Sequence, residues 1–291
     1  MSDPLIPIFR SGAAGPCFEN ALVLEARGFD YELRSDGASL EIAVPPADAE
    51  RARVELEHYR LENAPVPPAP GLRMEGGGGV GVFGFVIALL GVAWLDGRAA
   101  LGQDWFDAGR MSAAFVHAGE WWRPVTALTL HADAAHLFGN LVFGVLFGYA
   151  AGQLLGAGVA WFSILIAGAL GNVLNAFVQA PSHTSVGAST AVFAALGIVS
   201  AYVWRHQRRF GRHWAQRWAA LIAGAVLLTL LGVGDEHTDI VAHLTGFVSG
   251  VVAGGAWAML GERAPRRAAQ EAFGLAAASL LVLAWAAALH T

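Results

Sequence analysis

The chain has 291 residues, of which 55% are hydrophobic and 14% are charged, and its mean hydropathy is +0.49. A soluble domain usually carries about 25% charged residues, so this composition indicates a membrane protein. The single cysteine, Cys17, excludes a disulfide framework and a cysteine-based metal site. All 18 basic residues are arginine, which excludes Ser–Lys dyads, Schiff-base chemistry and a P-loop lysine.

The charges divide the chain into two different parts. Residues 1–75 carry 13 acidic residues and 7 arginines, a net charge of -6. Residues 76–291 carry 10 acidic residues and 11 arginines, a net charge of +1. The first part is polar and mixed, so we expect no cleavable signal peptide at its start.

Residues 1–66 are expected to form a small soluble α+β domain on the cytoplasmic side. Strand candidates lie at residues 5–9, 29–33 and 40–44, the last two around a Ser-Asp-Gly turn. Helix candidates lie at 17–27, ended by Gly28, and at 47–62. The order βαββα suggests a ferredoxin-like half-sandwich, in which we see no chemistry. Residues 67–79, rich in proline and glycine, are the expected linker.

Seven apolar segments follow, each long enough to cross the ~30 Å hydrocarbon core of a bilayer. They lie near residues 80–96, 136–155, 158–180, 187–204, 217–233, 240–260 and 271–289. We therefore expect an all-α polytopic bundle of seven transmembrane helices. Residues 80–260 would form a six-helix core, and residues 261–291 a basic loop with a seventh helix.

Arginine placement predicts the orientation in a bacterial inner membrane, because cytoplasmic loops carry the excess of positive charge. The loops after segments four and six are basic: Arg205, Arg208, Arg209, Arg212, Arg217, Arg263, Arg266 and Arg267. The loop after segment five holds Asp235, Glu236 and Asp239 instead. The amino terminus is therefore predicted in the cytoplasm and the carboxyl terminus in the periplasm.

The loop of residues 97–135 contains Trp105 and the pair Trp121-Trp122, the pair standing beside an arginine. Tryptophan is enriched where a membrane meets water. The mixed character of the whole loop predicts a folded element at the interface.

Polar side chains recur on two glycine-rich helix faces. His136 and Asn140 stand at i and i+4, and Gly144, Gly148 and Gly152 continue their face. In segment six, His243 lies beside a stripe of small residues formed by Ala242, Gly246, Gly250 and Gly254. Such faces pack against other helices instead of lipid, so the polar groups are expected inside the bundle.

Ser189 opens segment four, after the small-residue turn Ser-Val-Gly-Ala of residues 185–188. The predicted orientation brings Ser189, His243, His136 and Asn140 to one depth in the membrane. A serine hydroxyl becomes an effective nucleophile when a base accepts its proton, and His243 is the candidate base. Backbone N–H of Ser189 and the side chains of His136 and Asn140 are candidate donors to an oxyanion.

These motifs resemble those of the rhomboid intramembrane serine proteases. They are Glu120-Trp-Trp-Arg123, His131 to Asn140, Gly187-Ala-Ser189 and Ala242-His243-Leu-Thr-Gly246, within residues 75–260. The resemblance implies a Ser189–His243 dyad and an oxyanion hole of His136 and Asn140, with Trp122 and Arg123 in a structural first loop. The seventh segment resembles the family's six-plus-one arrangement. Thr190 departs from the family, which usually has glycine there, so it could widen the gap between segments four and six or hydrogen-bond into it.

The expected activity is cleavage of single-span transmembrane proteins near the outer membrane face. The expected partners are these substrates and the lipid bilayer, with no nucleic acid, metal or cofactor; the sequence does not indicate an oligomeric state. Three alternatives remain open. A zinc hydrolase would use His131, His136, His183 and His243, although His-Glu-x-x-His is absent. An aspartyl protease would use Asp235, which needs a second carboxylate. A non-catalytic relative would bind and escort membrane helices.

Overall fold

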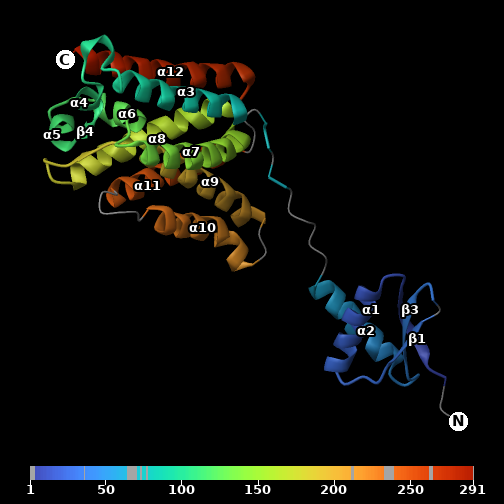
Figure 1. Cartoon of the computed structure of the whole chain (residues 1–291). Coiled ribbons are helices and arrows are strands. Elements are labelled where there is room, and N and C mark those ends of the chain that lie inside the picture. The colour runs from blue at the N-terminus through green and yellow to red at the C-terminus, as the bar shows by residue number, and fades with distance from the viewer. Residues whose placement is uncertain are drawn as a thin grey trace. The chain divides into compact units, whose positions relative to one another are not determined.

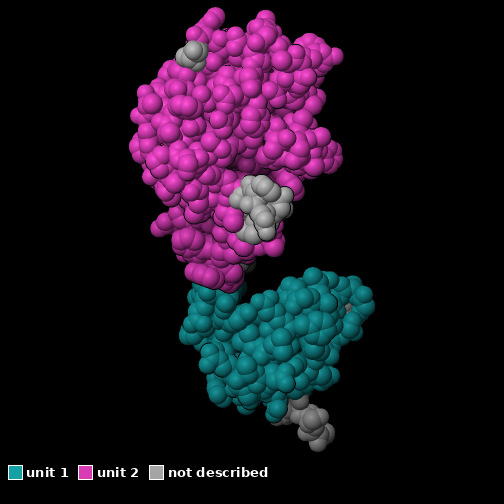
Figure 2. All heavy atoms as spheres, turned by 60° about the vertical axis from the view of Figure 1, so that its left-hand side comes forward, with its two compact units in different colours: residues 1–68 teal, residues 69–291 magenta. Residues whose placement is uncertain are grey.

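The computed structural model describes residues 4–35, 37–63, 71–72, 74–76, 78–210, 213–232, 239–261 and 265–290. The chain forms two compact units, residues 1–68 and residues 69–291 (Figures 1 and 2). Much of the predicted linker, residues 67–70, 73 and 77, lies outside the described residues.

The first unit has the predicted order of elements. These are β1 (Ile6–Ser11), α1 (Ala14–Ala26), β2 (Glu32–Ser35), β3 (Leu40–Val44) and α2 (Ala49–Glu62). Strand β3 pairs antiparallel with both other strands, so the sheet order is β1-β3-β2, as a ferredoxin-like half-sandwich requires. Leu24, Ile42 and Leu56 lie in the core between helices and sheet. Asp36 of the predicted turn lies outside the described residues.

The second unit is a helical bundle with a folded first loop (Figure 1). Its long helices are α3 (Gly78–Asp96), α7 (Ala134–Leu155), α8 (Ala157–Val178), α9 (Ser189–Phe210), α10 (Trp214–Gly232), α11 (Ile240–Leu260) and α12 (Arg267–His290). Each overlaps one of the seven apolar segments. Over the residues that the structure describes, five of them, α3, α7, α8, α11 and α12, are long and apolar enough to cross a membrane.

The expected count of seven transmembrane helices is therefore not confirmed. The apolar part of α9 ends before Arg205, and Arg208 and Arg209 follow within the same helix, which lowers its hydropathy. Within the part of α10 whose side chains the structure describes, the apolar stretch is Trp214–Leu230.

The first loop is folded, as its composition predicts. It contains α4 (Trp105–Gly109), β4 (Met111–Ser112), α5 (Ala113–His117) and α6 (Arg123–Thr126), with short 3₁₀ turns at Ala100–Gly102 and Ala127–Thr129. The buried Arg123 guanidinium donates to the carbonyl oxygens of Asp107 and Arg110, at 2.9 and 2.8 Å, and pairs with Glu120. Arg123 thus links the end of α4 to the start of α6 and to Glu120, whereas Trp121 remains exposed.

Small residues bring α9 and α11 into backbone contact. A Cβ added to Gly250 would lie 2.8 Å from the Ala194 Cα, and one added to Gly254 would lie 2.7 Å from the Ile198 Cα. Such distances are shorter than a side chain tolerates, so glycine is required at both positions. The predicted stripe on segment six is therefore the surface that packs against α9.

Candidate active site

The turn before Ser189 is shaped by a glycine. Gly187 has φ +135°, which disfavours any side chain, and its N–H donates to the Ala127 carbonyl oxygen at 3.0 Å. A Cβ at this position would lie 2.7 Å from the His136 Cε1, 2.8 Å from the His136 Nε2 and 3.6 Å from the Ser189 Oγ. The glycine therefore lets the His136 ring stand beside the first residue of α9.

His243 lies in the first turn of α11, and its side chain is buried. Its ring packs on Phe193 with centroids 4.6 Å apart. Phe193 follows Ser189 by four residues, so the two share a face of α9. The backbone N–H of His243 donates to the carbonyl oxygen of Asp239, the N-cap residue, at 3.1 Å.

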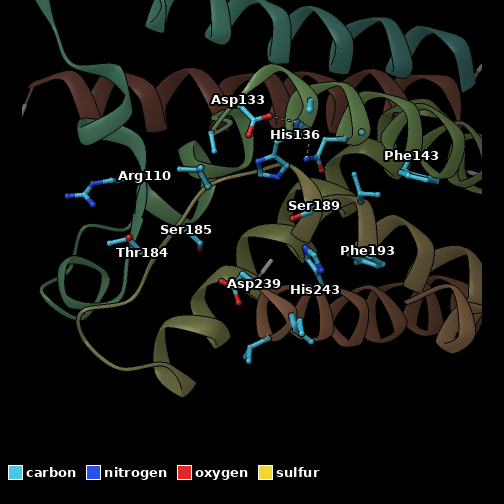
Figure 3. A pocket seen from close by; sticks show the side chains of 18 of the residues that line it. Arg110, Asp133, His136, Phe143, Thr184, Ser185, Ser189, Phe193, Asp239 and His243 are labelled. Atoms are coloured by element: carbon cyan, nitrogen blue, oxygen red, sulfur yellow. Dashed lines mark hydrogen bonds between the residues drawn. The ribbon is translucent and has the colours of Figure 1, made fainter. Parts of the chain in front are cut away.

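One cavity of about 860 Å³ joins the predicted site residues. Ser189, His243, His136 and Asn140 all line it, although they come from three helices. In Figure 3 the side chains of Ser189 and His243 point toward one another, with His136 on the far side of Ser189. The structure therefore brings together the four polar residues that the sequence placed at one depth.

The two candidate oxyanion donors differ in their present partners. Asp133 caps α7 by accepting the backbone N–H of His136 at 2.8 Å, which fixes the turn that carries the imidazole. Asn140 is buried, and its Nδ2 donates to the carbonyl oxygen of His136 at 2.9 Å. An amide group has two N–H donors, so this bond occupies one of them.

His131 contacts the turn that precedes Ser189. Its Nε2 accepts the N–H of Ala188 at 3.4 Å, and its ring meets the His136 ring edge-on at 5.2 Å. Burial, with a smaller contribution from His136, lowers the pKa of His131 to about 4. The ring is therefore neutral at physiological pH, as an accepting Nε2 requires.

Thr190 of α9 packs against both α8 and α11. Its side chain is buried, and its Cγ2 would lie 2.8 Å from a Cβ on Gly171 of α8 and 2.9 Å from one on Gly246 of α11. The methyl group thus occupies space that two glycines leave open. Helices α9 and α11 still approach at Gly246, so the threonine does not separate them.

Three residues that the sequence analysis did not single out together form a polar cluster beside the site. The Asp239 Oδ1 accepts the N–H of Ala242 at 3.0 Å. Its Oδ2 lies 2.7 Å from the Asn175 Nδ2 and 2.8 Å from the His183 Nε2. Burial raises the pKa of Asp239, but the hydrogen bonds from Ala242, His183 and Asn175 outweigh it and lower the pKa below its usual value. An aspartate before an apolar helix is a typical N-cap, which is the signal that could have found it.

No group of three or more His, Cys, Asp or Glu side chains suited to a metal ion occurs within the described ranges. Of the four histidines in the zinc alternative, His183 contacts Asp239, whereas His131 packs on His136. Asp235 of the aspartyl alternative lies outside the described residues.

Comparison with known proteins places these features in one family. A family model described as "Rhomboid domain" matches residues 118–259. The protein named "Putative rhomboid protease YdcA" of Bacillus subtilis is 30% identical over 170 residues, which cover 57% of this chain and 83% of that protein. The chain therefore belongs to the rhomboid family.

Two further relatives are similar over a smaller part of their own length. Rhomboid protease GluP of Bacillus subtilis is 28% identical over 148 residues, 51% of this chain and 28% of GluP. RHOMBOID-like protein 1 of Arabidopsis thaliana is 31% identical over 141 residues, 48% of this chain and 35% of that protein. These matches and the apolar helices support a multi-pass membrane protein and a hydrolase of the protease class.

Proposed function

We propose that the chain is a serine endopeptidase that cleaves single-span transmembrane proteins near the outer face of a bacterial inner membrane. The observation that carries the proposal is the cavity in which Ser189 of α9 and His243 of α11 face each other next to His136 and Asn140 (Figure 3). The family membership supports a protease, and the cavity supplies the chemical groups for one type of protease.

The proposed reaction has two halves. The Ser189 Oγ attacks the scissile carbonyl carbon while His243 takes the hydroxyl proton, and the resulting imidazolium gives that proton to the leaving amine. This leaves an acyl-enzyme on Ser189. Water then attacks the ester with His243 as base, and the Ser189 hydroxyl is restored when the acid product leaves. Phe193 packs against the His243 ring and limits its movement on that side.

The oxyanion formed in each half needs donors that are already in place. The backbone N–H of Ser189 opens α9, where the helix dipole favours negative charge. The His136 ring stands beside the Gly187 turn, and Asn140 has a second amide N–H. If His136 serves the oxyanion, His136→Ala should lower kcat by about 10² to 10³ without loss of substrate binding. An unchanged kcat would remove His136 from this role.

The proposal includes an orientation. Arg205, Arg208 and Arg209 lie at the end of α9 opposite to Ser189, and cytoplasmic ends carry arginine. The site would then open to the outer side, with the amino-terminal unit in the cytoplasm. Seven crossings, as in a six-plus-one arrangement, would include α9, which packs against several other helices, and α10, which lies at the edge of the bundle with an exposed apolar face.

The test is labelling of the purified full-length chain with a fluorophosphonate, followed by cleavage of a model single-span protein. Ser189→Ala should abolish both, because the nucleophile is removed, and His243→Ala should reduce both by several orders of magnitude. Ser200→Ala is the matched control, since Ser200 lies on the same helix but does not line the cavity.

Cleavage by Ser189→Ala at the parent rate would show that the dyad assignment is wrong. Binding of the model substrate by the parent chain with no cleavage under any condition would favour the alternative of a non-catalytic binding protein. Inhibition by a chelator but not by the fluorophosphonate would favour the zinc alternative.

A further inference from the structure

The Asn175–Asp239–His183 cluster connects the two segments that carry the proposed catalytic residues. Asp239 precedes His243 by one helical turn and caps α11. His183 lies in the segment between α8 and α9, six residues before Ser189. Asn175 lies in the last turn of α8 and is completely buried, so it provides a fixed point for both.

Both carboxylate oxygens of Asp239 have defined partners. Oδ1 accepts from Ala242 in its own helix, and Oδ2 accepts from Asn175 and His183. The carboxylate therefore joins α11 to its neighbours and does not orient the His243 ring as the acid of a triad does. Its effect on His243 passes through the helix start, where the Asp239 carbonyl oxygen accepts the His243 N–H.

The hydrogen bonds indicate which ring nitrogen of His183 carries a proton. An ionised carboxylate only accepts, so the His183 Nε2 must carry a proton to donate to Oδ2. The Asn175 Nδ2 is also a donor, so its 3.4 Å contact with the His183 Nε2 is not a hydrogen bond; both groups donate to the same oxygen. Charge-assisted bonds of this kind are stronger than neutral ones.

The segment of His183 is itself tied to the first loop. The His183 carbonyl oxygen accepts the N–H of Ala113 at 3.1 Å, and β5 (Thr184–Ser185) pairs antiparallel with β4. Asp239 and His183 both line the cavity (Figure 3 shows Asp239 beside His243). The cluster thus lies where α8, α11, the first loop and the approach to Ser189 meet.

We propose that Asp239, held by Asn175 and His183, is a positioning residue that sets His243 relative to Ser189. This inference rests on the proposed function, because it needs the two residues to act together. A proton transfer between them depends on their separation, and a misplacement of about 1 Å is enough to cost roughly 10² in rate. The cluster touches neither the Ser189 side chain nor the His243 side chain. Its effect on kcat therefore passes through the position of α11, which carries His243.

The first experiment replaces Asp239 with a residue that keeps the helix cap and loses the link. Serine caps helices nearly as well as aspartate, so Asp239→Ser should leave α11 formed but not tied to α8 and His183. We expect kcat for a model single-span substrate to fall about 10- to 100-fold, with KM within about threefold. The rate of fluorophosphonate labelling of Ser189 should fall in parallel.

Asp104→Ser is the matched control. Asp104 caps α4 by accepting the N–H of Asp107 at 2.9 Å, and it does not line the cavity. This variant should stay within about twofold of the parent in kcat and in labelling rate. The folded fraction of every variant, measured by thermal unfolding in detergent, is used to normalise its rate.

The second experiment uses His183. A glutamine can place an amide N–H near the position of the His183 Nε2, so His183→Gln should restore most of the kcat that His183→Ala loses. The double variant His183→Ala with Asp239→Ser should be no slower than Asp239→Ser, because both changes break one link.

Three outcomes would overturn the inference. One is a kcat of Asp239→Ser equal to that of Asp104→Ser after normalisation. Another is a His183→Gln rate as low as that of His183→Ala, and the third is a double variant whose losses multiply. Ser189→Ala is measured in parallel: cleavage by that variant would overturn the proposed function itself, whereas its inactivity beside a fully active Asp239→Ser would overturn the positioning role alone.

Discussion

Two of the helices that pack against α9 contact it in different ways. Helix α11 approaches it backbone to backbone, since Cβ atoms added to Gly246, Gly250 and Gly254 would meet main-chain atoms of α9. Helix α10 approaches it through side chains: a Cβ on Gly224 would meet the Ser200 Oγ first, then the Ser200 Cβ at 3.0 Å and the Phe247 ring of α11 at 3.2 Å. The outer face of α10 carries exposed apolar residues: Trp214, Ile222, Val226 and Leu230.

This difference indicates which helix contact fixes Ser189 relative to His243. In lipid the hydrophobic effect does not drive helices together, so close packing of small residues decides how firmly two helices are held. The α9–α11 contact carries Ser189 and His243, and there the backbones leave no room for adjustment. The α9–α10 contact carries neither residue, and it is made by side chains such as Ser200 and the Trp204–Trp218 ring pair.

The largest effect is expected from Gly250→Ala, which attacks the close contact directly. The added methyl would lie 2.8 Å from the Ala194 Cα and closer still to the Ala194 carbonyl oxygen, and neither atom moves without its helix. Overpacking of this kind costs roughly 3 kcal/mol. We expect a lower thermal midpoint in detergent and a loss of peptidase activity of more than tenfold, because Ser189 and His243 move apart.

Gly255→Ala on the same helix is the control, since a Cβ there meets nothing within 4 Å. It should be neutral, or more stable by up to about 1 kcal/mol, because alanine favours a helix over glycine. Equal effects of the two variants would show that helix propensity, and not contact with α9, explains the Gly250→Ala result.

The sequence predicted the close contact but not all the residues around it. Periodicity predicted the small-residue stripe of α11, because the i+4 spacing of glycines needs no tertiary information. The pairing of Asp239 with Asn175 and His183 depends on three segments distant in sequence, so no local pattern contains it. Thr190 shows a further limit: the space for its methyl exists because Gly171 and Gly246 face it from two other helices.

The number of transmembrane helices is a second property that the sequence alone did not determine. Apolar length predicted the seven long helices of the second unit, with ends within about six residues of those observed. The arginines of α9 reduce its hydropathy, yet its first half is nearly all buried, from Thr190 to Tyr202. A helix enclosed by other helices needs less apolar surface than one that faces lipid, so composition alone does not decide whether α9 crosses the membrane.

A smaller effect is expected at the start of α9, where His131 accepts the Ala188 N–H. The pKa of His131 falls from 6.5 to about 4 on folding, so below pH 6.5 the unfolded chain binds the proton more readily than the folded chain. The free energy of unfolding therefore falls as the pH drops from about 6.5 to 4, by about 3 kcal/mol, and this group contributes little further change below pH 4.

The measurement is the unfolding free energy in detergent at several values between pH 4 and pH 7. His131→Gln keeps an oxygen that accepts the Ala188 N–H but cannot titrate, so its stability should vary less with pH than that of the parent. Carboxylates that titrate in both proteins contribute equally to the two curves, so their effect cancels when the unfolding free energy of His131→Gln is subtracted from that of the parent. Parallel curves for the parent and His131→Gln would contradict the assignment of a neutral, accepting ring.

The smallest effect is expected from Gly224→Ala, which tests the contact between α9 and α10. The new Cβ would meet the Ser200 hydroxyl, and a rotation of that side chain relieves most of the contact. We expect a cost below about 1 kcal/mol and activity within twofold of the parent. Adding Ser200→Ala should recover the remaining loss, because it removes the obstructing oxygen. If Gly224→Ala instead costs as much as Gly250→Ala, α10 is held to α9 as firmly as α11 is, and the firm contact is not confined to the helices that carry Ser189 and His243.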